Sequence, residues 1–134
     1  MTAADEHEVD KFVGSKAWFD CGTLDLRNES YHYVRQVRWD LEAKAIVEMD
    51  VSLNDSSIQI DVKNKNTTHY LIDKINGSLA VQSLLNGHAG QYHCLITDEV
   101  TDTVEEAAYR LHVYGTQNQT DLANILIFIR IFCL

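Results

Sequence analysis

The fold of this chain is decided by residues 78–94, SLAVQSLLNGHAGQYHC. The segment predicts one strand, then a tight corner, then a second strand that carries Cys94. Side chains alternate between the two faces of a strand, so Tyr92 and Cys94 point to the same side. The chain has no proline and only 6 glycines, so its turns depend on Asn, Asp, Ser and Thr.

This segment resembles the corner between the fifth and sixth strands of immunoglobulin-superfamily domains. In that family a Gly and a Tyr stand four and two residues before the second disulfide cysteine, as Gly90 and Tyr92 do before Cys94. The family also has a first cysteine on an early strand and a core Trp on the next, and Cys21 and Trp39 match them. The resemblance implies a Cys21–Cys94 disulfide packed on Trp39, and a tyrosine hydroxyl that closes the corner.

The expected fold is therefore all-β, an immunoglobulin-like antiparallel β-sandwich with Greek-key connections. The long segment between Trp39 and Cys94 has room for strands over residues 45–50, 57–62 and 69–73, which favours the variable or intermediate type. We expect residues 1–10 to be an acidic N-terminal segment, residues 11–115 the domain, and residues 116–134 a linker with a short apolar tail. One position departs from the family pattern, because His88 replaces the usual Asp of the corner and His69 offers no permanent cation to pair with it.

Charge and cysteine content narrow the function classes. The formal net charge is -9 and the pI is near 4.9, which argues against a nucleic-acid partner and against docking to anionic lipid. Of the three cysteines, Cys133 has no expected partner, and two buried free thiols in a cytosolic protein are the alternative to the Cys21–Cys94 bridge.

Sequence motifs for N-glycosylation suggest export. The pattern N-x-S/T occurs at Asn28, Asn54, Asn66, Asn76 and Asn118, whereas this composition would produce about one by chance. All five fall in expected loops or after the last strand. We therefore expect a glycosylated protein that is secreted or held at the cell surface.

The two ends of the chain leave its membrane attachment open. The acidic start has no apolar core and cannot be a signal peptide, so either the mature domain begins there or an upstream segment is missing. Residues 125–134, ILIFIRIFCL, are apolar but only about half the ~20 residues of a membrane span. They could be a truncated membrane anchor, part of an anchor-attachment signal, read-through sequence, or an extra strand or helix on the domain.

Strand alternation places six side chains on the outer side of the sheet that contains Trp39 and Cys94. The set carries two arginines, two histidines and an exposed leucine on an otherwise acidic domain, and no glycosylation motif falls within its strands. In immunoglobulin-superfamily domains this face often contacts another protein, so the resemblance implies a protein ligand or a homophilic immunoglobulin partner here. The alternatives are an ordinary solvated sheet face and a spacer domain that binds nothing. The six residues are Gln36, Arg38, His93, Leu95, Arg110 and His112.

No catalytic constellation, phosphate-binding loop or cofactor motif is present, so we expect neither an enzyme nor a cofactor. His93 and His112 could lie side by side on neighbouring strands, but without a third ligand they predict a polar pair and not a metal site. An acidic cluster near the last turn lacks the ligand spacing of a calcium loop and is expected to be solvated. Its members are Asp98, Glu99, Asp102, Glu105 and Glu106.

Overall fold

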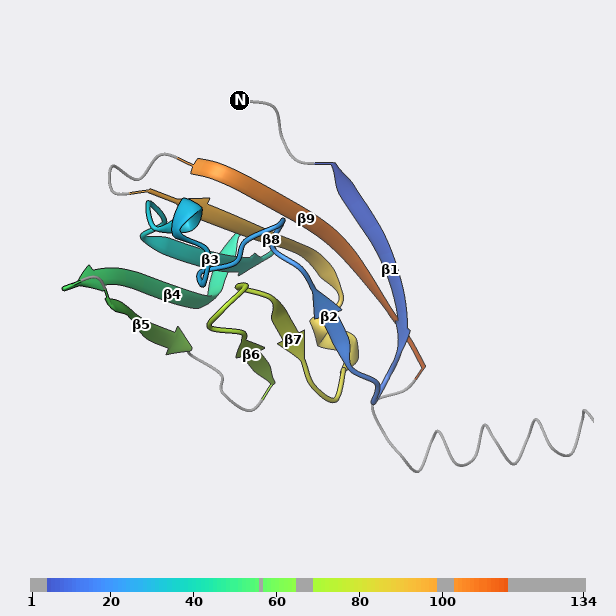
Figure 1. The fold of residues 1–134 in the computed structure, drawn as a ribbon. Helices are drawn as coiled ribbons and strands as arrows, with labels where there is room; N and C mark the ends of the chain where they lie inside the picture. The colour runs from blue at the N-terminus through green and yellow to red at the C-terminus, as the bar shows by residue number, and fades with distance from the viewer. Residues whose placement is uncertain (1–4, 56, 65–68, 99–102, 116–134) are drawn as a thin grey trace, which may run out of the picture.

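The computed structural model describes residues 5–55, 57–64, 69–98 and 103–115, which form two packed β-sheets (Figure 1). The larger sheet has six strands in the order β1-β9-β8-β3-β4-β5, and the smaller has three in the order β2-β7-β6. This confirms the all-β sandwich. The strands are β1 (Glu6–Phe12), β2 (Ala17–Phe19), β3 (Gln36–Leu41), β4 (Lys44–Asn54), β5 (Ser57–Asn64), β6 (Tyr70–Ile72), β7 (Leu79–Val81), β8 (Gly90–Thr97) and β9 (Thr103–Tyr114).

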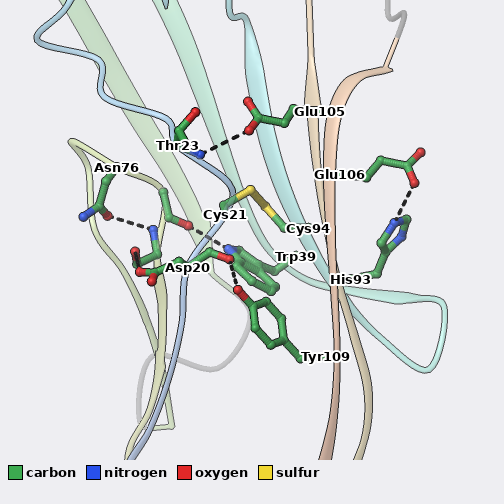
Figure 2. Close-up of a disulfide and its surroundings, with 12 residues drawn as sticks. Asp20, Cys21, Thr23, Trp39, Asn76, His93, Cys94, Glu105, Glu106 and Tyr109 are labelled. Carbon is green, nitrogen blue, oxygen red and sulfur yellow. Dashed lines mark hydrogen bonds and ion pairs between the residues drawn. A yellow bond between two sulfur atoms is a disulfide. The ribbon is translucent and has the colours of Figure 1, made fainter. Parts of the chain in front are cut away.

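The core lies between the sheets and is centred on the predicted disulfide. Cys21 and Cys94 are bonded, with their Cα atoms 5.8 Å apart, and Trp39 beside them is fully buried (Figure 2). The Trp39 indole nitrogen donates a hydrogen bond of 2.8 Å to the carbonyl of Gly77, so its one polar atom is satisfied. Gly77 has φ +72°, and a Cβ there would press on Leu24 and Val37 at about 3.1–3.2 Å, so glycine suits this close approach.

The corner before β8 is closed as the sequence predicts, and the structure shows how it works without the usual Asp. The buried Tyr92 hydroxyl donates to the His88 carbonyl at 2.6 Å. The His88 ring takes the place of a carboxylate, because its Nδ1 accepts the Leu85 amide proton at 2.9 Å. The His69 ring packs against it at 4.8 Å between centroids. Two packed imidazole rings thus stand where the family pattern has an ion pair.

The sandwich begins earlier than we expected from the sequence. Residues 6–10, which we assigned to a segment ahead of the domain, belong to β1, which pairs in parallel with β9. The strand is too acidic to be buried, but an edge strand needs only its inward Val9 to touch the core. Its outward carboxylates meet hydrogen-bonding partners on β9, which explains why a polar segment forms a strand.

Candidate partner-binding face

Strand register brings the six predicted face residues onto one side of the larger sheet, which we call the outer face. Residues opposite each other on paired strands share a side, so each row across the sheet can be followed from strand to strand. One row joins Arg38 to Leu95 and Glu106, and continues on the other side of Arg38 to Glu48 and then to Lys63 on β5. Leu95 therefore lies near the middle of this row, with charged residues on both sides.

A second row passes through Gln36. It connects Gln36 to Thr97 and Thr103 in one direction and to Asp50 and Asp61 in the other. Together the two rows border a hollow of about 310 Å³ on the outer face. The hollow is lined by Gln36, Arg38, Leu95, Thr97 and Thr103, three of which belong to the predicted set.

Both arginines of the predicted face are paired with carboxylates. Arg38 Nε lies 3.0 Å from Asp40, a residue only 5% exposed, and Arg38 Nη2 donates to the same carboxylate at 3.2 Å. Arg110 Nε donates to Glu6 at 2.9 Å. That hydrogen bond is the main reason why the pKa of Glu6 is lowered, and Glu6 raises the pKa of Arg110 in turn. Each of the two arginines therefore already has a carboxylate partner within this chain.

Lys63, the third permanent cation on the described strands of the outer face, is also paired. Lys63 Nζ lies 3.0 Å from Asp50, which also accepts a hydrogen bond of 3.1 Å from Gln36 Nε2. The hydrogen bond from Gln36, followed by that from Lys63, lowers the pKa of Asp50. Asp50 thus stays ionised and holds the side chains of β3 and β5 in position.

The two histidines are not brought together. His93 lies opposite Ala108 and contacts Glu106 at 3.3 Å, whereas His112 is further along β9 and bonds to Glu8. Each imidazole has its own carboxylate, so the side-by-side pair considered from the sequence does not form. Across the ranges that the structure describes, no group of three or more His, Cys, Asp or Glu side chains could hold a metal ion.

The acidic cluster is divided by the strand alternation of β9. Glu105 points toward the loop after β2, where it accepts the Thr23 amide proton at 3.1 Å. Glu106 points to the outer face and contacts His93 (Figure 2). Glu99 and Asp102 lie outside the described residues. The two described glutamates of β9 therefore act separately.

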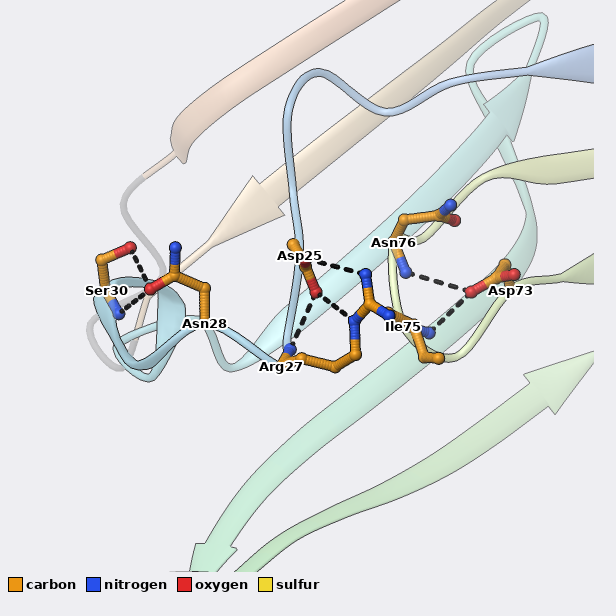
Figure 3. A network of polar contacts seen from close by, with 7 residues as sticks. All are labelled: Asp25, Arg27, Asn28, Ser30, Asp73, Ile75 and Asn76. Atoms are coloured by element: carbon orange, nitrogen blue, oxygen red, sulfur yellow. Dashed lines mark hydrogen bonds and ion pairs between the residues drawn. The ribbon is translucent and has the colours of Figure 1, made fainter.

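Three of the five motif asparagines fall in the described residues, although Ser56 of the Asn54 motif does not. Asn28 is exposed and its Oδ1 accepts hydrogen bonds from the amide and hydroxyl of Ser30, while Asn76 is half-buried in the turn after β6 (Figure 3). Asn54 is exposed at the end of β4, and strand alternation places it on the same side as Asp50, at the tip of the β4–β5 hairpin. A glycan there would border the outer face, which the sequence did not indicate. Asn66 and Asn118 lie outside the described residues.

The carboxylates that surround the predicted residues were not among those expected from the sequence. Asp40, Glu48 and Asp61 share the outer face with Arg38 and Gln36. The regular alternation of β4, in which Glu48 and Asp50 are interleaved with buried Val47, Met49 and Val51, is the signal that could have found Glu48.

No helix among the described residues is long and apolar enough to cross a membrane, and residues 116–134, where an anchor was considered, are not described. Cys133 belongs to that undescribed segment.

Comparison with known proteins identifies the fold through solved structures. No protein-family model matches the chain, and no curated protein matches it in sequence. CD84, a SLAM-family protein, aligns with a TM-score of 0.59 at 16% identity over 82% of this chain and 98% of its own. The CD2-binding domain of CD58 aligns with a TM-score of 0.51 at 16% identity over 81% of this chain and 54% of that one.

The extracellular domain of the voltage-gated sodium channel beta4 subunit aligns with a TM-score of 0.60 at 17% identity, over 87% of this chain and 91% of that one. The match agrees with the topology, because β4 and β5 extend the sheet of β3, β8 and β9 as the two extra strands of variable-type domains do. The chain therefore has the immunoglobulin fold, in the variable-type arrangement of its strands.

Proposed function

We propose that this protein is an extracellular immunoglobulin-like recognition module that binds a protein partner through the outer face of β3, β8 and β9. The observation that carries the proposal is the hollow beside Leu95, which combines an apolar side chain with polar groups already held in place by neighbours. Groups that are preorganised lose less conformational freedom when a partner binds. A leucine ringed by polar residues is also the usual composition of a small protein contact.

Three further observations support a location outside the cell. The buried Cys21–Cys94 disulfide is stable in oxidising compartments. The side chains of Asn28 and Asn54 are exposed, as those of glycosylated asparagines are. The similar structures include a CD2-binding domain and a subunit whose homodimer is described as explaining cell–cell adhesion, so the fold is one that adhesion proteins use.

The test compares two variants that each replace a leucine by arginine, one on each sheet. Leu95→Arg places a charge in the hollow, and Leu71→Arg places the same charge on the outward side of the smaller sheet, where Leu71 is 46% exposed. Biotinylated wild-type protein, made into tetramers on streptavidin, is applied to an array of displayed cell-surface proteins, and the variants are applied to each positive spot. We expect at least one specific interaction that Leu95→Arg lowers by roughly tenfold or more and Leu71→Arg leaves unchanged.

Two results would contradict the proposal. A partner whose binding is insensitive to Leu95→Arg would move the site off the outer face. The absence of any partner, with both variants folded, would support the alternative that the domain is a spacer. Mass analysis of the protein secreted from animal cells tests the compartment, because occupied glycosylation motifs require passage through the secretory pathway.

A further inference from the structure

We infer that the partner of the outer face presents a basic surface, and hence that it is a different protein and not a second copy of this chain. The inference rests on the proposed function, because it names the chemistry of the partner that the same face would bind. It follows from how charge is distributed over that face, on which the sequence had drawn attention only to two arginines and two histidines.

The charge of the outer face is strongly negative once its pairs are counted. In its described strands, each of the three permanent cations has its own carboxylate, Arg38 with Asp40, Lys63 with Asp50 and Arg110 with Glu6. These pairs are close to neutral when seen by an approaching molecule. Five further carboxylates share the same side: Glu8, Asp10, Glu48, Asp61 and Glu106.

Two of these five carboxylates have no hydrogen-bond donor among the described residues. Glu8 and Glu106 contact histidines and Asp10 accepts from the Tyr114 hydroxyl, whereas Glu48 and Asp61 make no side-chain hydrogen bond there. Lys63 lies near both, but its ion pair is with Asp50. Within the described strands, Glu48 and Asp61 are thus the carboxylates of the outer face that are best placed to meet a cation from outside.

Both carboxylates lie on the β4–β5 side of the hollow, Glu48 one strand and Asp61 two strands from the residues that line it. Glu48 lies directly opposite Arg38, which lines the hollow, and Asp61 lies opposite Asp50, the hydrogen-bond partner of Gln36 on the hollow's other side. A protein that covers Leu95 would therefore also cover this acidic margin on β4 and β5. Lysine or arginine side chains around an apolar centre are the groups that complement it.

The same distribution disfavours pairing of two copies through this face. A symmetric dimer brings the same patch of each subunit together, so the excess carboxylates of one copy would approach those of the other. Unpaired like charges in a desolvated contact destabilise it, and the arginines cannot compensate without leaving Asp40 and Glu6. Only a partner with the opposite charge removes this cost.

A titration with charged peptides tests the first half of the inference. The isotope-labelled domain is titrated with a dodecalysine peptide and separately with a dodecaglutamate peptide, and amide shifts are followed by NMR. We expect dodecalysine to shift residues around Glu48 and Asp61 on β3, β4 and β5, and dodecaglutamate to shift none. The double variant Glu48→Gln with Asp61→Asn should weaken dodecalysine binding by roughly three- to tenfold, as expected for the loss of two charge pairs at surface positions, one half-buried and one exposed.

A matched variant controls for the overall charge of the chain. Asp5→Asn with Glu29→Gln also removes two exposed carboxylates, one ahead of β1 at the opposite edge of the sheet and one in the loop before β3. It should change dodecalysine binding by less than twofold. Equal weakening by both double variants would overturn the basic-partner inference, because binding would then follow net charge and not this site.

Sedimentation of the wild-type chain over a concentration series tests the second half. We expect a monomer at both low and high salt. A dimer that Leu95→Arg disrupts and Leu71→Arg does not would overturn the inference while leaving the proposed function standing. The proposed function itself fails on a different result, a partner that binds Leu95→Arg as well as wild type.

Discussion

Removing the Tyr92 hydroxyl should destabilise the domain more than removing the Tyr109 hydroxyl, although both donate equally short hydrogen bonds. Tyr92 is fully buried, and its hydroxyl donates to the His88 carbonyl at 2.6 Å. Burial is also the main reason why the pKa of Tyr92 is raised, so the group remains a neutral donor at any pH at which the domain is folded. In Tyr92→Phe the His88 carbonyl loses this donor inside the core, where water does not replace it.

The expected loss is about 2 kcal/mol of unfolding free energy. A typical hydrogen bond contributes about 1 kcal/mol net, and a buried acceptor left without a partner costs about 1–3 kcal/mol. The aromatic packing is kept, because phenylalanine retains the ring that lies 5.0 Å from Phe19. The loss therefore reports the polar contacts of the hydroxyl, with the His88 carbonyl and with neighbouring Tyr70, and not a cavity.

Tyr109→Phe is the matched control. Its hydroxyl donates to the Asp20 carbonyl at the same 2.6 Å (Figure 2), and its ring lies 4.9 Å from Phe19. Tyr109 and Asp20 are both reached by solvent, so water can satisfy the Asp20 carbonyl after the substitution. We expect a loss below about 1 kcal/mol for this variant.

Urea denaturation followed by tryptophan fluorescence measures both losses. The slope of unfolding free energy against urea concentration must be the same for all variants. Equal losses would refute the reasoning, since the two bonds differ mainly in burial. A larger loss for Tyr109→Phe would show that the corner is held by packing alone.

Three other predictions address the core, the corner and the first strand. Replacing Cys21 and Cys94 together by alanine should lower the unfolding free energy by about 4 kcal/mol, measured by denaturation, because the bridge spans a sequence separation of 73 residues. Burial, followed by the neighbouring His69, lowers the pKa of His88. The unfolded chain therefore binds this proton more readily, and the unfolding free energy should fall as the pH drops below about 6.5. His88→Asn keeps an acceptor for the Leu85 amide and should flatten that part of a curve of unfolding free energy against pH. Arg110→Met removes the ion pair to β1, and hydrogen exchange in that strand should quicken while exchange in β8 stays slow.

Much of the sandwich could be predicted because its signals are local. Alternation with period two orients Tyr92, Cys94 and Ile96 toward the core, and all three are fully buried. The cysteines and Trp39 lie where the family pattern implied, and the strands between β3 and β8 lie within a few residues of their predicted positions. A strand's inward face can be deduced from its own residues, since burial selects apolar side chains at every second position.

The partners of the outward residues could not be deduced in this way. Glu6 and Arg110 are 104 residues apart in the sequence and meet only because β1 pairs in parallel with β9 in one register. A shift of that register would give each outward charge a different neighbour and leave the hydrophobic pattern of β9 unchanged. The sequence by itself thus determined which side chains face outward, whereas only the tertiary structure decided which of their charges are neutralised, because ion pairing depends on lateral contacts between strands that are distant along the chain.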